Sequence, residues 1–265
     1  MNTLFTICNK EIINLKTNDT VQSVERAIEL LYCFTAQTPE LTLNDFVKRT
    51  GLNRTTVFRL LSSLMKKELI SKNEGKNTYQ LGLPFIHFGQ IVSENLDLRR
   101  MALPVMNRLT EVSKETISLN IVQGAARICV EKIEGKEDIR QFIHLGIPYP
   151  LYKGASGKLL LAYSTEELIE EVIEGSGMTN DETKALKKDL IQIKDQGFAF
   201  SRNERITGAF AISTPILNSQ HELMGGLSIS GLSARLDNNK QLFIEAAIQS
   251  AEKLSAMMGY QKLGG

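Results

Sequence analysis

The stretch that decides the fold is residues 41–81, which read LTLNDFVKRTGLNRTTVFRLLSSLMKKELISKNEGKNTYQL. Thr42 can cap a helix whose apolar residues fall at helical spacing, and the Thr50-Gly51 pair can end that helix. Asn53 can cap a second helix after a tight turn. Its apolar stripe consists of Val57, Leu60, Leu61 and Leu64. The stretch therefore predicts two helices joined by a tight turn.

Two short β-prone runs follow the second helix, at residues 69–71 and 78–81. The residues between them form turns readily and include two lysines, so the runs are predicted to pair as a two-stranded wing. A helix-turn-helix followed by a wing is the layout of a domain that reads DNA, with the second helix in the groove.

Cations gather in this part of the chain. Residues 48–76 hold eight lysines and arginines against two glutamates, whereas the whole chain has a net charge of only +1. Such a patch supplies the salt-sensitive part of nucleic-acid affinity. The alternatives are a solvated charged face and a helix-turn-helix used for protein interaction. The residues expected to contact DNA are Thr42, Arg54, Thr55, Thr56, Phe58, Arg59, Ser62, Lys66, Lys72 and Lys76.

Length and composition set the outer limits. The chain has 265 residues, 42% of them hydrophobic, which is enough for two domains with their own cores. No apolar run approaches the roughly 20 residues of a membrane helix, and the start lacks a secretory signal, so a cytoplasmic protein without membrane contact is expected. Three distant cysteines predict neither a disulfide framework nor a zinc site, and no cofactor is expected.

The pattern divides the chain into five parts. Residues 1–20 are a polar tail, 21–82 the winged helix-turn-helix domain with its first helix at 21–35, 83–97 a linker helix, 98–260 a second domain, and 261–265 a short tail. The linker is more apolar than an exposed helix should be. It is therefore expected either to join two copies of the chain or to pack in a core of its own chain.

The second domain has an α+β pattern. A helix is predicted from residue 98 to 114, strands at 117–122, 127–133, 141–144, 209–217 and 224–230, and a last helix from Asp237 to Met258. An antiparallel sheet flanked by helices fits this order. After Glu94 the chain carries twenty cations and twenty-one carboxylates, so this domain has no electrostatic footprint for DNA.

Several segments together resemble the isocitrate-lyase-regulator (IclR) family of bacterial transcription regulators. They are VQSVERA at 21–27, TGLNRTTVFRLL at 50–61, YQLG at 79–82, GASGK at 154–158, GFA at 197–199 and LSISG at 227–231. The resemblance runs from about Val21 to Tyr260. It implies a winged helix-turn-helix domain, a linker helix and a GAF-like domain that binds a small-molecule effector, in a dimer or tetramer that reads operator DNA.

The resemblance also implies an effector pocket. Its residues here would be Gly154, Ala155, Ser156, Ser201, Ala211, Ser213, Ser228 and Ser230. Ser228 and Ser230 are two apart on a predicted strand, so both hydroxyls can face one ligand, although a satisfied pair of core hydroxyls is the alternative. Amides of the Gly-Ala-Ser loop would suit a carboxylate, so the expected effector is an organic or sugar acid.

Two positions depart from the family pattern. Ser201 stands where many members have Asp, and Ala211 where many have Cys, so this pocket is expected to be roomier and less acidic. Arg202 or Glu204 could replace the lost polar contacts if either side chain points inward.

Enzyme motifs are incomplete. Gly157-Lys158 is followed by Leu159, which breaks the phosphate-binding-loop pattern, and the three histidines lie far apart in the sequence. The expected protein is a regulator and not an enzyme. The alternatives are an enzyme that uses its helical domain for assembly, and a DNA-binding scaffold whose C-terminal domain binds a protein.

Overall fold

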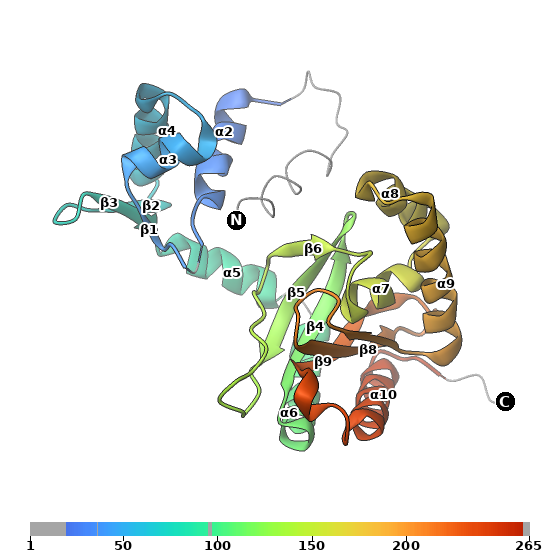
Figure 1. Cartoon of the computed structure of the whole chain (residues 1–265). Coiled ribbons are helices and arrows are strands. Elements are labelled where there is room, and N and C mark those ends of the chain that lie inside the picture. The colour runs from blue at the N-terminus through green and yellow to red at the C-terminus, as the bar shows by residue number, and fades with distance from the viewer. Residues whose placement is uncertain (1–19, 36, 95–96, 262–265) are drawn as a thin grey trace. The chain divides into compact units, whose positions relative to one another are not determined.

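The computed structural model describes residues 20–35, 37–94 and 97–261. Among them, residues before 95 form one compact unit and residues from 97 onward another (Figure 1). The predicted tails lie outside the described residues, apart from Thr20 and Gln261. Both units combine helices with antiparallel strands, which confirms the predicted α+β class.

The first unit contains the predicted helix-turn-helix and wing. Its elements are α2 (Gln22–Tyr32), β1 (Glu40–Leu41), α3 (Leu43–Thr50), α4 (Arg54–Lys66), β2 (Ile70–Asn73), β3 (Thr78–Leu81) and α5 (Pro84–Glu94). Thr42 caps α3 and Asn53 caps α4, as predicted, and Gly51 ends α3 with a φ of 70°. A side chain-bearing residue would be strained at that φ, so glycine suits the turn between the helices.

The wing is one strand larger than predicted. β1 pairs with β3, so the sheet has the order β1-β3-β2, with Leu41 opposite Tyr79. A strand of two residues has too short a pattern to be recognised from the sequence.

Phe46 is at the centre of the first unit's core. It is fully buried, and its ring makes edge contacts with Phe34 and Tyr79 at centroid distances of 5.4 and 6.1 Å. Leu30, Val57 and other apolar residues of the two helices complete the cluster. Packing around an aromatic centre fixes α3 and α4 against each other and against the wing.

Helix α5 matches the predicted linker helix. It follows the wing directly and leaves Ile86 and Phe88 exposed, with Leu83 exposed just before it. These neighbouring side chains make a larger apolar surface than the single exposed residues normal in a soluble protein.

The second unit is built on a six-stranded antiparallel sheet. Its order is β6-β5-β4-β9-β8-β7. The strands are β4 (Thr116–Gln123), β5 (Ala126–Ile133), β6 (Pro148–Pro150), β7 (Ala199–Arg202), β8 (Ala209–Leu217) and β9 (Leu223–Leu232). The helices are α6 (Asp97–Ser113), α7 (Ala155–Ala162), α8 (Glu166–Ser176), α9 (Asn180–Gln196) and α10 (Lys240–Met257), with a short 3-10 turn at Ser233–Arg235.

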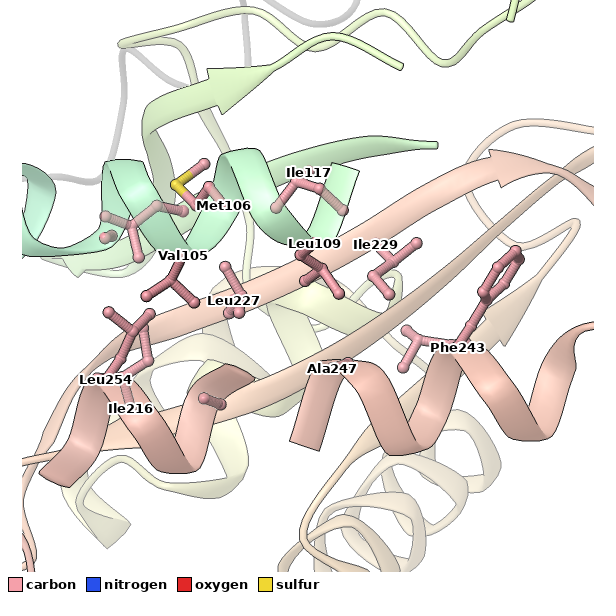
Figure 2. Packing of buried hydrophobic residues seen from close by; sticks show 14 of the residues in the cluster. Val105, Met106, Leu109, Ile117, Ile216, Leu227, Ile229, Phe243, Ala247 and Leu254 are labelled. Atoms are coloured by element: carbon pink, nitrogen blue, oxygen red, sulfur yellow. The ribbon is translucent and has the colours of Figure 1, made fainter. Parts of the chain in front are cut away.

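The two faces of this sheet have different chemistry. One face is apolar and packs against α6 and α10, where Met106 and Leu109 meet Leu227 and Ile229 (Figure 2). The other face is covered in part by α7, which packs with α8 and α9 in a separate apolar cluster. The pleat gives alternate residues to the two faces, so this second face holds the polar residues described below.

Two sequence predictions for this unit are wrong. Residues 141–144 form no strand; instead Thr116 Oγ1 donates to the Gln141 carbonyl at 2.9 Å, and the edge strand is β6. A side chain thus anchors this segment where strand pairing was expected. The last helix begins at Lys240 and not at Asp237, whose carboxylate pairs with Arg202 at 2.8 Å. None of the helices among the described residues has the length and apolar character needed to span a membrane.

Candidate functional site

The second helix of the first unit has one buried and one exposed side. Val57, Leu61 and Leu64 are buried in the core, while Thr55 and Arg59 are exposed on the surface. Phe58 is 52% exposed, which is unusual for a large aromatic side chain. The exposed side therefore presents hydrogen-bonding, cationic and aromatic groups near the start of the helix, as a recognition helix does.

The N-terminal end of α4 is suited to a negatively charged partner. Its first turn contains no acidic residue, and Arg54 lies there with its guanidinium 2.5 Å from Asn44 Oδ1. The Thr56 amide is bound to the Asn53 side chain at 2.8 Å. The positive end of the helix dipole is thus exposed without a competing carboxylate.

The other predicted DNA contacts differ in how free they are. Arg59 and Lys66 are exposed and form no ion pair with any described residue. By contrast, Lys72 is 2.8 Å from Glu74 and Lys76 is 3.2 Å from Glu40. These wing lysines would have to exchange carboxylates for phosphates, which exposed pairs do at little cost.

Two predicted contacts have hydroxyls with partners inside the unit. Thr42 Oγ1 donates to Asp45 Oδ2 at 2.7 Å and accepts from the Asp45 amide in a capping box. Ser62 Oγ donates to the Phe58 carbonyl at 2.8 Å. Their local role is therefore structural, and any DNA contact would use what these bonds leave free.

In the second unit, the sheet face opposite α6 and α10 is polar. Along β4, Thr116, Ser118 and Asn120 alternate with apolar residues, and all three are buried. Register places Ser118 beside Ser228 of β9, and Ser228 beside Ser213 of β8. Three neighbouring strands therefore hold hydroxyl and amide groups on one face.

A hydrogen-bond network joins these groups to a buried arginine. Arg127 Nη1 donates to Asn120 Oδ1 at 2.7 Å, and Asn120 Nδ2 donates to Ser118 Oγ at 3.0 Å and Ser228 Oγ at 3.3 Å. The hydroxyls of Ser213 and Ser228 are 2.8 Å apart. Asn120 thus uses its oxygen and nitrogen on opposite sides of the network and connects all its members.

Arg127 has no carboxylate partner among the described residues, although only 4% of it is exposed. Its guanidinium carbon is 4.9 Å from the centre of the Tyr149 ring, and that of Arg205 is 5.2 Å from the same ring. Burial, followed by repulsion from Arg205, lowers the pKa of Arg127 to about 10. The group still carries a full positive charge at neutral pH.

The Gly-Ala-Ser loop before α7 is bound to side chains of β7 and the loop after it. The Gly154 amide donates to Glu204 Oε1 at 3.0 Å, and the Ala155 amide donates to Ser201 Oγ at 3.0 Å. Glu204 is also 3.1 Å from Lys158. Of the two possible replacements, Glu204 therefore points toward the loop, whereas Arg202 pairs with Asp237 at the surface.

The predicted effector residues thus fall into two groups. Ser213 and Ser228 share the network around Asn120, and Ser230 donates to the Thr116 carbonyl at 3.4 Å. The group around α7 contains Gly154, Ala155, Ser156, Ser201 and Ala211. Sequence reasoning missed Asn120 and Arg127, although the alternation of polar and apolar residues along β4 could have revealed the polar face.

A hollow elsewhere in the unit involves none of the predicted residues. It measures about 600 Å³, lies along α9 and α10, and is lined by Lys158, Phe198, Phe200 and Lys240 among others. Lys240 Nζ lies 4.2 Å from the centre of the Phe200 ring there. Among the described residues, no group of three His, Cys, Asp or Glu side chains is placed to hold a metal ion.

Family models match both units. The IclR helix-turn-helix domain matches residues 23–74, and the C-terminal part of the bacterial transcriptional regulator IclR matches residues 90–256. Together these matches cover the helix-turn-helix and almost all of the second unit.

Curated relatives are similar over nearly the full chain. The chain is 33% identical to the HTH-type transcriptional regulator KipR of Bacillus subtilis, over 90% of this chain and 98% of the relative. It is 30% identical to XynR of Escherichia coli, over 91% of this chain and 98% of that protein.

Solved structures show the same fold. An IclR regulator from Alicyclobacillus acidocaldarius has a TM-score of 0.77 at 24% identity, covering 91% of this chain and all of that one. An IclR homolog from Microbacterium hydrocarbonoxydans, complexed with 4-hydroxybenzoate, has a TM-score of 0.77 at 22% identity, covering 89% and 99%. The chain belongs to the IclR family and is a helix-turn-helix transcriptional regulator that binds DNA.

Proposed function

We propose that α4 reads operator DNA with Thr55, Phe58 and Arg59, while Arg54, Lys66 and the wing lysines contact phosphates. The observation that carries this assignment is the exposure of Phe58 and Arg59 opposite a buried apolar stripe. Base edges are read by short polar, aromatic and guanidinium groups, and phosphates by flanking cations. Thr42, Thr56 and Ser62 add contacts at the edge of this surface.

The second unit binds a small organic acid, which alters the operator affinity of the first. Support comes from the buried hydroxyl and amide network, whose groups can orient a ligand, and from the related regulator complexed with 4-hydroxybenzoate. The proposed boundaries are 21–82 for the reading domain, 83–97 for the linker and 98–260 for the effector domain. The unit acts as a sensor, not as an enzyme.

The regulator works as a homo-oligomer in the cytoplasm, where operator DNA lies. The exposed apolar surface at Leu83, Ile86 and Phe88 supports this assembly, because a second copy can cover it. Two reading domains then meet two half-sites of an operator with two-fold symmetry.

Operator binding by the full chain tests this proposal. A labelled duplex from upstream of its own gene is titrated by fluorescence anisotropy at fixed salt, with wild type, Arg59→Ala and Arg100→Ala. Arg100 is an exposed arginine of the second unit and serves as the matched control. Arg59→Ala should weaken binding by about 1–3 kcal/mol if it contacts a base. Equal affinities of the two variants would overturn the assignment of Arg59.

A further inference from the structure

We propose that Arg127 is the anion-recognising residue of the effector site, so that the ligand's carboxylate is held by this guanidinium and not by the Gly-Ala-Ser loop. This inference rests on the proposed effector function of the second unit. It assigns the ligand's charged end to β5 and β6, where the sequence predicted no site residue.

The first argument is an unsatisfied charge. Arg127 is nine-tenths or more buried, forms no ion pair with any described residue, and its Nε atom has no hydrogen-bond partner there. A buried donor without a partner costs free energy, and the cost is larger for a charged group. A bound anion would remove it.

The second argument is the absence of carboxylates on this side of the sheet. β5 has an irregular register opposite Leu119, so Glu131 lies opposite Leu119 and pairs with Arg99 of α6 at 2.6 Å. Cys129 lies opposite Asn120 on the polar face. The strand therefore presents Arg127 to the polar face and directs its nearest carboxylate away from it.

The third argument is that the loop amides are already occupied. Glu204 accepts from the Gly154 amide and Ser201 accepts from the Ala155 amide. A carboxylate arriving at this loop would meet Glu204, whose like charge repels it. The negative end of a ligand is therefore favoured at Arg127 and disfavoured at the loop.

The geometry of Arg127 also defines the ligand's chemistry. Asn120 holds one terminal nitrogen, Nη1, and Tyr149 supports the face of the guanidinium. The side edge, which includes Nε, matches the two oxygens of a carboxylate in a bidentate contact. The exposed Arg205 stacks on the same tyrosine and attracts anions toward this edge. The ligand class is a small monocarboxylate whose other end can reach the Ser213 and Ser228 hydroxyls.

Ligand binding to the full chain tests the inference. The probes are acetate, glyoxylate, pyruvate, benzoate and 4-hydroxybenzoate, each beside its neutral amide, examined by thermal shift and then by calorimetric titration. At least one acid should bind while its amide does not. Arg127→Gln should weaken that acid about 10- to 100-fold, because it removes a charge-assisted bond. Arg127→Lys should retain part of the affinity, and Arg140→Gln, an exposed control, should retain all of it.

A second readout does not depend on how well a variant folds. The Nε–H resonance of Arg127, assigned by its loss in Arg127→Lys, should shift when the binding acid is added to wild type. Absence of binding by every acid, equal binding of acid and amide, or an unmoved resonance would overturn the inference. Operator affinity is measured separately. Arg127-dependent binding without any change in operator affinity would leave this inference standing and overturn only the proposed regulation.

Discussion

Two phenylalanines of the first unit have opposite environments on neighbouring helices. Phe46 is fully buried and contacts two aromatic rings, whereas Phe58 is 52% exposed on the outer side of α4. Exposing a large aromatic ring is unfavourable in water. Its position beside Thr55 and Arg59 indicates that Phe58 contributes to DNA contact and Phe46 to the core.

This contrast predicts different results for the same truncation. Phe46→Ala should lower the free energy of unfolding by about 3–5 kcal/mol, because it opens a cavity in the core. Phe58→Ala should leave stability almost unchanged and weaken operator binding. Urea unfolding and anisotropy titration of both variants measure the two effects. A large loss of stability in Phe58→Ala would show that this ring is a core residue.

Asn120 occupies a comparable position in the second unit. It connects Arg127 to Ser118 and Ser228, and it is completely buried. Asn120→Leu keeps the approximate size but leaves the Arg127 guanidinium without this acceptor, so the unit should lose about 1–3 kcal/mol of stability. Ser118→Ala, which removes one neutral partner, should cost about 1 kcal/mol or less. Equal losses in the two variants would contradict a central role for Asn120.

At the scale of elements, the N-terminal end of α3 contains a titratable cap. Hydrogen bonds from the Thr42 side chain and then from its backbone lower the pKa of Asp45 below its ordinary value of 3.8. Because the folded pKa is the lower one, the stabilisation is present above pH 3.8 and is lost as the pH falls through the folded value.

The pH dependence of Asp45→Asn follows from this sign. The variant should be less stable than wild type at pH 7, and the difference should shrink as the pH falls below 3.8. Thermal melts across this range measure it. A difference that is the same at pH 7 and at pH 3 would mean that the carboxylate charge does not matter to the cap.

The contact of α7 with the segment before it depends on Gly157. An added Cβ would lie 2.7 Å from the Leu151 carbonyl oxygen and 2.8 Å from that of Pro150. Both obstacles are backbone atoms, so α7 would have to move away from the sheet edge. Gly157→Ala should therefore destabilise the second unit by about 1–3 kcal/mol. Unchanged unfolding in urea would show that α7 can shift freely.

The sequence predicts well those elements whose signals are local. Thr42, Gly51 and Asn53 mark the ends of α3 and α4, and the structure confirms each of them. It predicts poorly what depends on pairing between distant segments. Gln141 was expected in a strand and instead accepts a bond from Thr116, and the contact of Arg127 with Asn120 follows from the irregular register of β4 and β5. Such neighbours become visible only when the sheet is assembled.

At the scale of the whole molecule, charge separates the two tasks. Residues 48–76 carry an excess of cations, while the chain after Glu94 is nearly neutral. Affinity for DNA therefore belongs to the first unit, and a ligand of the second can act only through a coupling free energy between them. By linkage, operator DNA must then change the affinity for the ligand by the same factor.

The central claim is that α4 reads a specific operator, and the DNA sequence enriched by the chain from a random duplex library tests it most directly. The account predicts one motif with two-fold related half-sites, enriched by wild type at moderate salt. Arg59→Ala should lose preference at a defined position in each half-site, while Arg100→Ala should enrich the wild-type motif. Enrichment of no motif by wild type, or of the same motif by Arg59→Ala, would contradict the account.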